Sequence, residues 1–292
     1  MTLAWKKVAI VLTGVMIISG GGIAYQKLRR LPEHIVPSTV STISDLLDSS
    51  DAYVRRGEDR ADFYAVAAAE SIALVAVRMD SLDPDVLHRL ARAQLALHKF
   101  DEVLFLQNYV LKLHPQNSMA WGIQGDAFQE LGKYRSADSS YYAMYTFDQG
   151  FHSMLRIARE EFLLRDYDKA LSFIDEAIEK GKGEELEPHE LAAGYLQLGE
   201  MLLARGYLEP ALHNVEYTLT LRPEWASAVA VKVRLLRIQR RYGEAADVCR
   251  RLVAISHHPR YTAMLARLYK DLDRQGAADS LVQVAEAQFD TL

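Results

Sequence analysis

Two sets of side chains recur along the middle of this chain with one shared, uneven spacing. The first set is aromatic or leucine and follows a short turn-like stretch, at Phe100, Tyr134, Tyr167, Leu208 and Tyr242. The second set is small except at its last member, at Ala91, Gly125, Ala158, Gly199 and Val233. Both sets advance by 34, 33, 41 and 34 residues. Two independent sets in one phase indicate an internal structural repeat.

The chemistry of the repeat predicts an all-α fold built from antiparallel helix pairs. One pair buries an apolar face only when the next pair stacks on it. Small residues let the two helices of a pair cross closely, and the second helix supplies its own at Ala137, Ala170, Ala211 and Ala245. Gly132 and Gly206 stand where the first helix ends and φ turns positive. Pro115 and Pro223 stop the second helix before the next pair begins.

These residues resemble the tetratricopeptide repeat. The copy from residue 118 carries the family's signature at Trp121, Gly125, Phe128, Gly132, Tyr134, Ala137 and Tyr141. The copy from residue 192 carries it at Tyr195, Leu198, Gly199, Ala211 and Pro223. The resemblance covers about residues 84–257. It implies a right-handed superhelical solenoid of stacked helix-turn-helix repeats, with a concave groove lined by the first helix of each pair.

The expected layout is an anchor at 1–30, a linker at 31–48 and a repeat array at 49–292. The linker contains two prolines and a Ser/Thr-rich stretch, and a short helix could begin at Ser41. We expect six helix pairs and at most seven, in repeats at about 50–83 (degenerate), 84–117, 118–150, 151–191, 192–225, 226–257 and 258–292 (partial). The step of 41 adds seven residues near 181–190. A longer loop or longer flanking helices is favoured there over a hinge, because loops accept insertions at low cost.

Residues 8–25 form an uncharged run of 18 residues, which is near the lower limit for crossing a bilayer. Basic residues flank the run on both sides, as at the ends of a membrane helix: Lys6, Lys7, Lys27, Arg29 and Arg30. The run therefore predicts one transmembrane helix and a single-pass membrane protein, with a cleaved signal peptide as the alternative. The flanking charges nearly balance, but short N-terminal tails usually stay in the cytoplasm. The exported side is therefore favoured for the body, with the cytoplasmic side as the alternative.

The charge is unevenly divided. The whole chain carries −5 and residues 1–30 carry +5, so the remainder carries −10. An acidic body excludes nucleic acid as the expected partner, because phosphate binding needs a dense basic surface. The single cysteine, Cys249, excludes an intrachain disulfide and a cysteine-rich zinc site. Its place in an apolar helical pattern predicts a buried thiol.

Catalytic motifs are missing from the sequence. It contains no HExxH metal motif, no phosphate-binding glycine loop followed by Lys-Ser/Thr, and no G-x-S-x-G. His257 and His258 are adjacent, so their side chains point apart on a helix. We therefore predict no enzyme activity, no catalytic residue, no cofactor and no metal.

The candidate binding residues lie on the inner face of the first helices. The ninth position of successive repeats alternates in charge, at Arg92, Asp126, Arg159, Glu200 and Arg234, with His88, Gln129 and Arg237 nearby. Two compatible interpretations are a ladder of ion pairs between repeats and a groove that grips a partner peptide. Some tetratricopeptide domains hold a C-terminal carboxylate with lysine and asparagine in the groove. The matching positions here are His88, Arg89 and Arg92, and Leu155, Arg156 and Arg159, so that mode is disfavoured.

These features together predict a membrane-tethered adaptor that recruits or organises an unknown partner protein through its concave groove. The alternative is a structural protein whose arrays associate with one another at the membrane as homo-oligomers.

Overall fold

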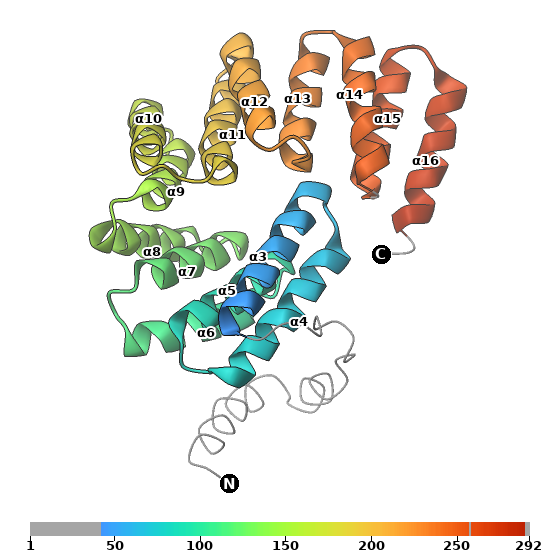
Figure 1. Cartoon of the computed structure of the whole chain (residues 1–292). Helices are drawn as coiled ribbons and strands as arrows, with labels where there is room; N and C mark the ends of the chain where they lie inside the picture. The colour runs from blue at the N-terminus through green and yellow to red at the C-terminus, as the bar shows by residue number, and fades with distance from the viewer. Residues whose placement is uncertain (1–41, 257, 290–292) are drawn as a thin grey trace.

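The computed structural model describes residues 42–256 and 258–289, and these form fourteen α-helices in seven antiparallel pairs (Figure 1). The pairs, in chain order, are α3 (Ile43–Arg60) with α4 (Phe63–Met79), α5 (Pro84–Ala96) with α6 (Phe100–Leu113), α7 (Ser118–Glu130) with α8 (Tyr134–Phe147), α9 (Phe151–Leu163) with α10 (Tyr167–Gly183), α11 (Pro188–Ala204) with α12 (Leu208–Leu221), α13 (Ala226–Ile238) with α14 (Tyr242–Ile255), and α15 (Pro259–Asp271) with α16 (Gln275–Phe289). The all-α stacked solenoid is confirmed.

The first pair begins earlier than the sequence indicated. The expected linker at 31–48 is too long, because α3 starts at Ile43. Thr42 and Asp45 form a capping box: the Thr42 hydroxyl accepts from the Asp45 amide at 3.2 Å, and the Asp45 carboxylate accepts from the Thr42 amide at 3.1 Å. The Ser/Thr-rich stretch therefore ends in a helix start. The described residues form seven pairs, the upper limit expected, rather than six.

Close helix crossings explain the small residues. A methyl group added at Gly125 would lie 2.4 Å from Cε1 of Tyr141, and one added at Gly199 would lie 2.8 Å from Cγ2 of Val215. Gly57 has the same role in the first pair, 2.3 Å from Cγ2 of Val66, and it precedes Ala91 by 34 residues. The small set therefore extends into the pair whose repeat was expected to be degenerate.

The turn inside each pair places one residue at positive φ. Gly132 and Gly206 have φ of 70° and 82°, as expected from the sequence. The equivalent residues of the other pairs are not glycine, although they have the same left-handed backbone: Ala61, His98, Arg165, Arg240 and Asp273. The fold therefore imposes this turn even where the sequence has no glycine to favour it.

The seven extra residues near 181–190 lengthen two helices. Helix α10 has 17 residues, against 14 in α6, α8, α12 and α14. Helix α11 also has 17, against 13 in α5, α7, α9, α13 and α15. Phe151 packs against Gly181 and Gly194 of the two helices, at 2.9 Å and 3.2 Å from the positions of an added Cβ. Lengthened flanking helices, one of the expected alternatives, account for the step of 41.

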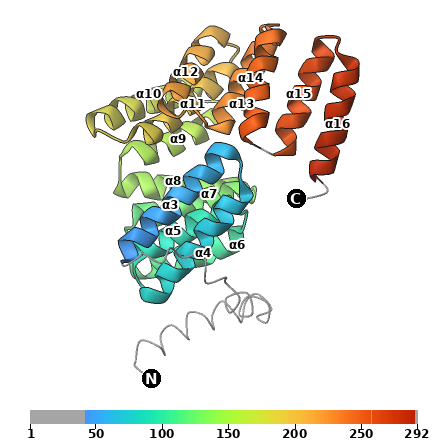
Figure 2. The ribbon, with the colours of Figure 1, turned by 45° about the vertical axis from the view of Figure 1, so that its right-hand side comes forward.

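The array curves until its two halves meet. The C-terminal end of α3 lies against α13, and both ribbon views show it facing that helix (Figures 1 and 2). Cys249 is fully buried, as predicted. Within residues 42–256 and 258–289, no helix has the length and apolarity needed to cross a membrane. The predicted anchor at 8–25 lies outside these residues.

Candidate binding cavity on the inner face

The inner face of the curved array forms a cavity of about 830 Å³, lined by α3, α5, α7, α9 and α11 and open to solvent. A volume of this size lies in the range of ordinary ligand sites. Most of the residues that line it are polar or charged, with three histidines and five carboxylates among them. The six arginines that line it are Arg55, Arg89, Arg92, Arg156, Arg159 and Arg222. The arrangement of these cations decides what the cavity can hold.

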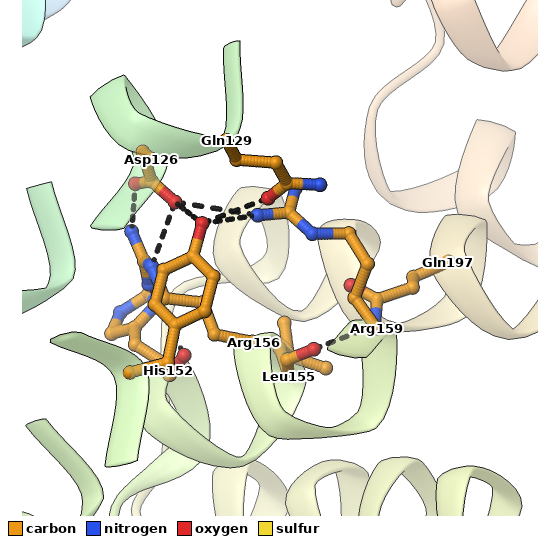
Figure 3. A network of polar contacts seen from close by, with 8 residues as sticks. Asp126, Gln129, His152, Leu155, Arg156, Arg159 and Gln197 are labelled. Atoms are coloured by element: carbon orange, nitrogen blue, oxygen red, sulfur yellow. Dashed lines mark hydrogen bonds and ion pairs between the residues drawn. The ribbon is translucent and has the colours of Figure 1, made fainter. Parts of the chain in front are cut away.

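Asp126 of α7 is the centre of one charge cluster (Figure 3). Arg156 of α9 donates to both carboxylate oxygens, at 3.1 Å and 2.6 Å. Arg159, one turn further along α9, donates at 3.4 Å. Burial alone would raise the pKa of Asp126, but the charges and hydrogen bonds of the arginines outweigh it and hold the pKa below the ordinary value. The carboxylate is therefore ionised and links two adjacent helix pairs.

Tyr141 completes this cluster from α8. Its hydroxyl accepts from Arg159 at 2.8 Å and lies 2.9 Å from Asp126 Oδ1 and 2.8 Å from Gln129 Oε1. The hydroxyl has one proton, so it donates to one of these two acceptors at a time. Burial first, and the Asp126 charge next, raise the pKa of Tyr141 far above its usual value. The phenol therefore stays neutral and orients the groups around it.

Asp51 of α3 forms a second cluster of the same composition. Arg89 and Arg92 of α5 donate to its carboxylate at 2.9 Å and 3.3 Å. In both clusters, two arginines three residues apart on one helix share a single carboxylate from the preceding pair. Each cluster therefore retains one net positive charge. The cavity therefore presents two cationic centres, although residues 31–292 carry a net charge of −10.

Two histidines add polar groups to the wall. His152 Nε2 lies 3.4 Å from a Glu190 carboxylate oxygen, and His189 Nε2 lies 3.3 Å from Arg55. Burial first, and the Arg156 charge next, lower the pKa of His152. This histidine is therefore neutral at pH 7 and available as a hydrogen-bond partner.

The structure brings four of the eight predicted groove residues to the cavity wall: Arg92, Asp126, Gln129 and Arg159. The expectation for His88 is wrong. Its ring is 2% exposed, with Nδ1 3.0 Å from Gln107 Oε1 and Nε2 3.1 Å from Asn117 Oδ1. These amide groups on α6 and at the start of α7 bury the ring inside the stack, and burial lowers the pKa of His88.

The other three predicted residues, Glu200, Arg234 and Arg237, do not line the cavity. Arg237 pairs with Asp271 of the next pair, with Nε 2.5 Å from the carboxylate. Crowding by the surrounding protein raises the pKa of Glu200, and the Arg234 and Arg159 charges oppose this. Within the part of the chain that the structure describes, Glu200 and Arg234 form no ion pair within 4 Å. Of the predicted ladder at the ninth position, the Asp126–Arg159 pair is formed.

Sequence reasoning missed the contribution of α3. Asp51, Arg55 and Glu58 line the cavity, yet this helix overlaps the segment read as linker. Sequence reasoning also considered Arg89 and Arg156 only as positions of a carboxylate-binding mode, which it disfavoured. The available signal was their recurrence three residues before Arg92 and Arg159.

Fold and site together define a class: an all-α solenoid of helical hairpins whose inner helices line an arginine-rich cavity. No family model matches the chain, and no curated protein matches it. Three solved structures give its structural relatives.

The chain is similar in fold to a tetratricopeptide repeat protein from Parabacteroides merdae, with a TM-score of 0.53 and 17% identity over 84% of this chain and 93% of that one. It is similar to the Cut9–Hcn1 hetero-tetramer of the APC/C, with a TM-score of 0.62 and 15% identity over 85% of this chain and 50% of that one. It is similar to human IFIT1 with m7Gppp-AAAA, with a TM-score of 0.67 and 12% identity over 85% of this chain and 59% of that one. The chain thus spans half of the Cut9–Hcn1 chain that it matches. These likenesses show a tetratricopeptide-type fold.

Proposed function

We propose that this chain is a non-catalytic scaffold, a right-handed tetratricopeptide superhelix that binds a segment of a partner protein in its inner cavity. The observation that carries the proposal is the cavity of about 830 Å³ with an arginine–aspartate–arginine cluster on each of two walls. The half-neutralised guanidiniums offer hydrogen-bond donors to backbone carbonyls and carboxylates. Such groups suit a polar polypeptide segment.

A protein partner fits the charge of the body better than nucleic acid does. One of the structural neighbours, human IFIT1, was solved with m7Gppp-AAAA, so nucleic acid is the competing class of partner. Here, however, residues 31–292 carry a net charge of −10. Five of the six cavity arginines form an ion pair with a carboxylate, and Arg55 is the exception among the described residues. Nucleic-acid affinity rests on unpaired cations that release counterions. The Cut9–Hcn1 structure is a hetero-tetramer, an assembly of proteins.

We further propose that residues 8–25 tether the scaffold to a membrane as a single transmembrane helix, with the body on the exported side. The uncharged run and its basic flanks support the tether. Carbonate extraction of the full-length chain tests it, because a spanning helix stays with the bilayer. Protease treatment of intact and opened cells then tests the side that the body occupies.

Photo-crosslinking tests the cavity. A photoreactive residue at Gln129, on the cavity wall, and one at Ser139, exposed on α8, are introduced separately into the full-length chain in its host cells. We expect the Gln129 position to capture a distinct protein that the Ser139 position does not. Capture is expected to weaken when Arg92 and Arg159 are both changed to glutamate. Equal capture from both positions, or capture indifferent to the charge reversal, rejects the cavity as the site.

The alternative function is self-assembly of the arrays into homo-oligomers. Light scattering over a range of protein concentrations separates the two. A scaffold for another protein keeps the mass of one chain, whereas a self-assembling array gains mass as the concentration rises. Capture of a second copy of this chain at Gln129 also favours self-assembly.

A further inference from the structure

Helix α3 makes a contact that a simple solenoid lacks. In stacked repeats each pair touches only its neighbours. Here the end of α3, in the first pair, reaches α13, in the sixth (Figures 1 and 2). We call this contact the clasp: Glu58, Asp59, Arg60 and Ala61 on one side, and Arg222, Glu224 and Ala226 on the other.

Arg222 is the centre of the clasp. Its side chain is 10% exposed, although it follows directly after α12. The guanidinium donates to the Asp59 carboxylate, to Glu58 at 3.0 Å and to the Arg55 carbonyl at 3.4 Å. Its Cζ lies 4.4 Å from the centre of the Trp225 ring. The cation therefore sits at the C-terminal end of α3, where the helix dipole favours positive charge.

The remaining clasp contacts are weaker. Arg60 donates to one Glu224 oxygen at 2.8 Å and 3.2 Å, and both side chains are about half exposed. Ala61 packs on a small apolar cluster that includes Ala226. One methyl group buries little apolar area. Exposed ion pairs contribute little in water and are screened by salt. The clasp therefore depends mainly on the charges around Arg222.

The clasp also forms part of the cavity wall. Arg55 and Glu58 of α3, and Arg222 itself, line the cavity described above. Helix α3 otherwise packs on α4 and α5, its neighbours in the array. Opening of the clasp would let the α3–α4 pair rotate on α5 as a rigid body and widen the mouth of the cavity.

We propose that α3 is a gate for the cavity and that the clasp holds the gate shut. This inference rests on the proposed function for its biological meaning, because the gate would control access of the partner segment. A partner must then either enter when the clasp is open or compete for Arg222 with its own carboxylates. Access is expected to increase as ionic strength rises, since Glu58, Asp59 and the Arg60–Glu224 pair are exposed enough for salt to screen their charges.

Thiol labelling of the full-length chain tests the gate without a partner. Ala193→Cys places a thiol on the cavity wall, and Ser139→Cys places one on the exposed surface of α8. Cys249 is buried and supplies the low background. The probe is a maleimide carrying a bulky polyethylene glycol chain. We expect Arg222→Gln, or salt raised from about 0.05 to about 1 M, to speed labelling of Ala193→Cys about tenfold and to leave Ser139→Cys unchanged.

Equal labelling of Ala193→Cys with and without the clasp, including no labelling in either, overturns the gate. Hydrogen exchange of the same proteins guards against misfolding. In a folded Arg222→Gln protein, faster exchange is confined to α3 and the start of α13. If the whole chain exchanges faster, Asp59→Asn, which removes one of the two carboxylates bound by Arg222, replaces Arg222→Gln in both measurements. Failure of partner capture at Gln129 with a working gate rejects the proposed function alone.

Discussion

The two charged regions of the inner face are built from the same groups but differ in burial. In the Asp126 cluster, the Arg156 and Asp126 side chains are 21% and 17% exposed, and Tyr141 seals them from one side. In the clasp, Arg222 is 10% exposed, but its acceptors Asp59 and Glu58 are 26% and 43% exposed. The Arg60 and Glu224 side chains are 43% and 52% exposed. Buried ion pairs are costly to break, whereas exposed pairs exchange readily with water and salt. The first region should therefore behave as framework and the second as a moving part.

The largest expected effect comes from Asp126→Asn. The change leaves two arginines without their shared carboxylate in a largely buried place, so we expect a loss of about 3–5 kcal/mol in the free energy of unfolding. Urea unfolding measures it. The matched control is Asp271→Asn, which removes an ion pair whose arginine is more exposed, and which should cost less than about 1 kcal/mol. Equal losses would mean that the two pairs do not differ as their burial suggests.

Gly125→Ala is expected to have the next largest effect. The added methyl group would lie 2.4 Å from the Tyr141 ring, which must move away from the Asp126 cluster. Overpacking of this kind costs about 1–3 kcal/mol. Gly243→Ala is the control, because its methyl group meets no atom within 4 Å and should instead stabilise α14 by up to about 1 kcal/mol. Thermal unfolding of both variants checks the difference in sign.

Acid should weaken the interior of the stack through two histidines. Burial lowers the pKa of His88 and of His152 below the ordinary 6.5. The folded chain therefore binds fewer protons there than the unfolded chain. Their stabilising contribution is complete above pH 6.5 and declines as the pH falls below it. Asp126 has a lowered pKa, so its contribution persists well below that range.

We expect the loss of stability below pH 6.5 to be smaller than that caused by Gly125→Ala. It is measured as the difference between wild type and His88→Gln, which keeps a side chain able to hydrogen-bond and cannot titrate. Unfolding curves at several pH values give this difference. A pH dependence identical in the two proteins would show that His88 has the same pKa in the folded and the unfolded chain.

The smallest effect is expected for Glu224→Gln at the clasp. Its ion pair with Arg60 is half exposed, so its loss should cost under about 1 kcal/mol. High salt should abolish the difference from wild type, while the Asp126→Asn difference should survive salt. Comparison of the two variants at low and high salt measures this. A salt-insensitive Glu224→Gln effect would argue that the clasp is as rigid as the buried cluster.

Much of the fold was predictable because its signals are local. Close crossings require Gly125 and Gly199, and the turn favours Gly132 and Gly206. Each of these helix pairs can therefore be recognised from a short segment of sequence. The first pair was harder to read. Gly57 occupies the small position, but Ala61 stands at the turn where two other pairs have glycine. The capping box at Thr42 lies in a Ser/Thr-rich stretch.

The site was less predictable than the fold. Charge alternation identified Arg92, Asp126 and Arg159 as inner-face residues, with Gln129 nearby. Burial of His88 could not be predicted in this way, because it depends on two amides from other helices. The meeting of α3 with α13 depends on the small rotation between each pair and the next, summed over the intervening pairs. No single segment of the sequence contains that sum.

The left-handed turns suggest that the array holds unused stability. Arg165 and Arg240 have φ of 68° and 61°, a conformation that costs an L-residue about 1–2 kcal/mol and glycine almost nothing. Glycine also has more conformational freedom in the unfolded chain, which offsets part of this advantage. The net stabilisation is therefore about 0.5 kcal/mol for each replacement. The two turns belong to different, non-adjacent pairs, so the gains should add. A variant stabilised in this way, with its inner face unchanged, would suit crystallisation of the scaffold with its binding partner.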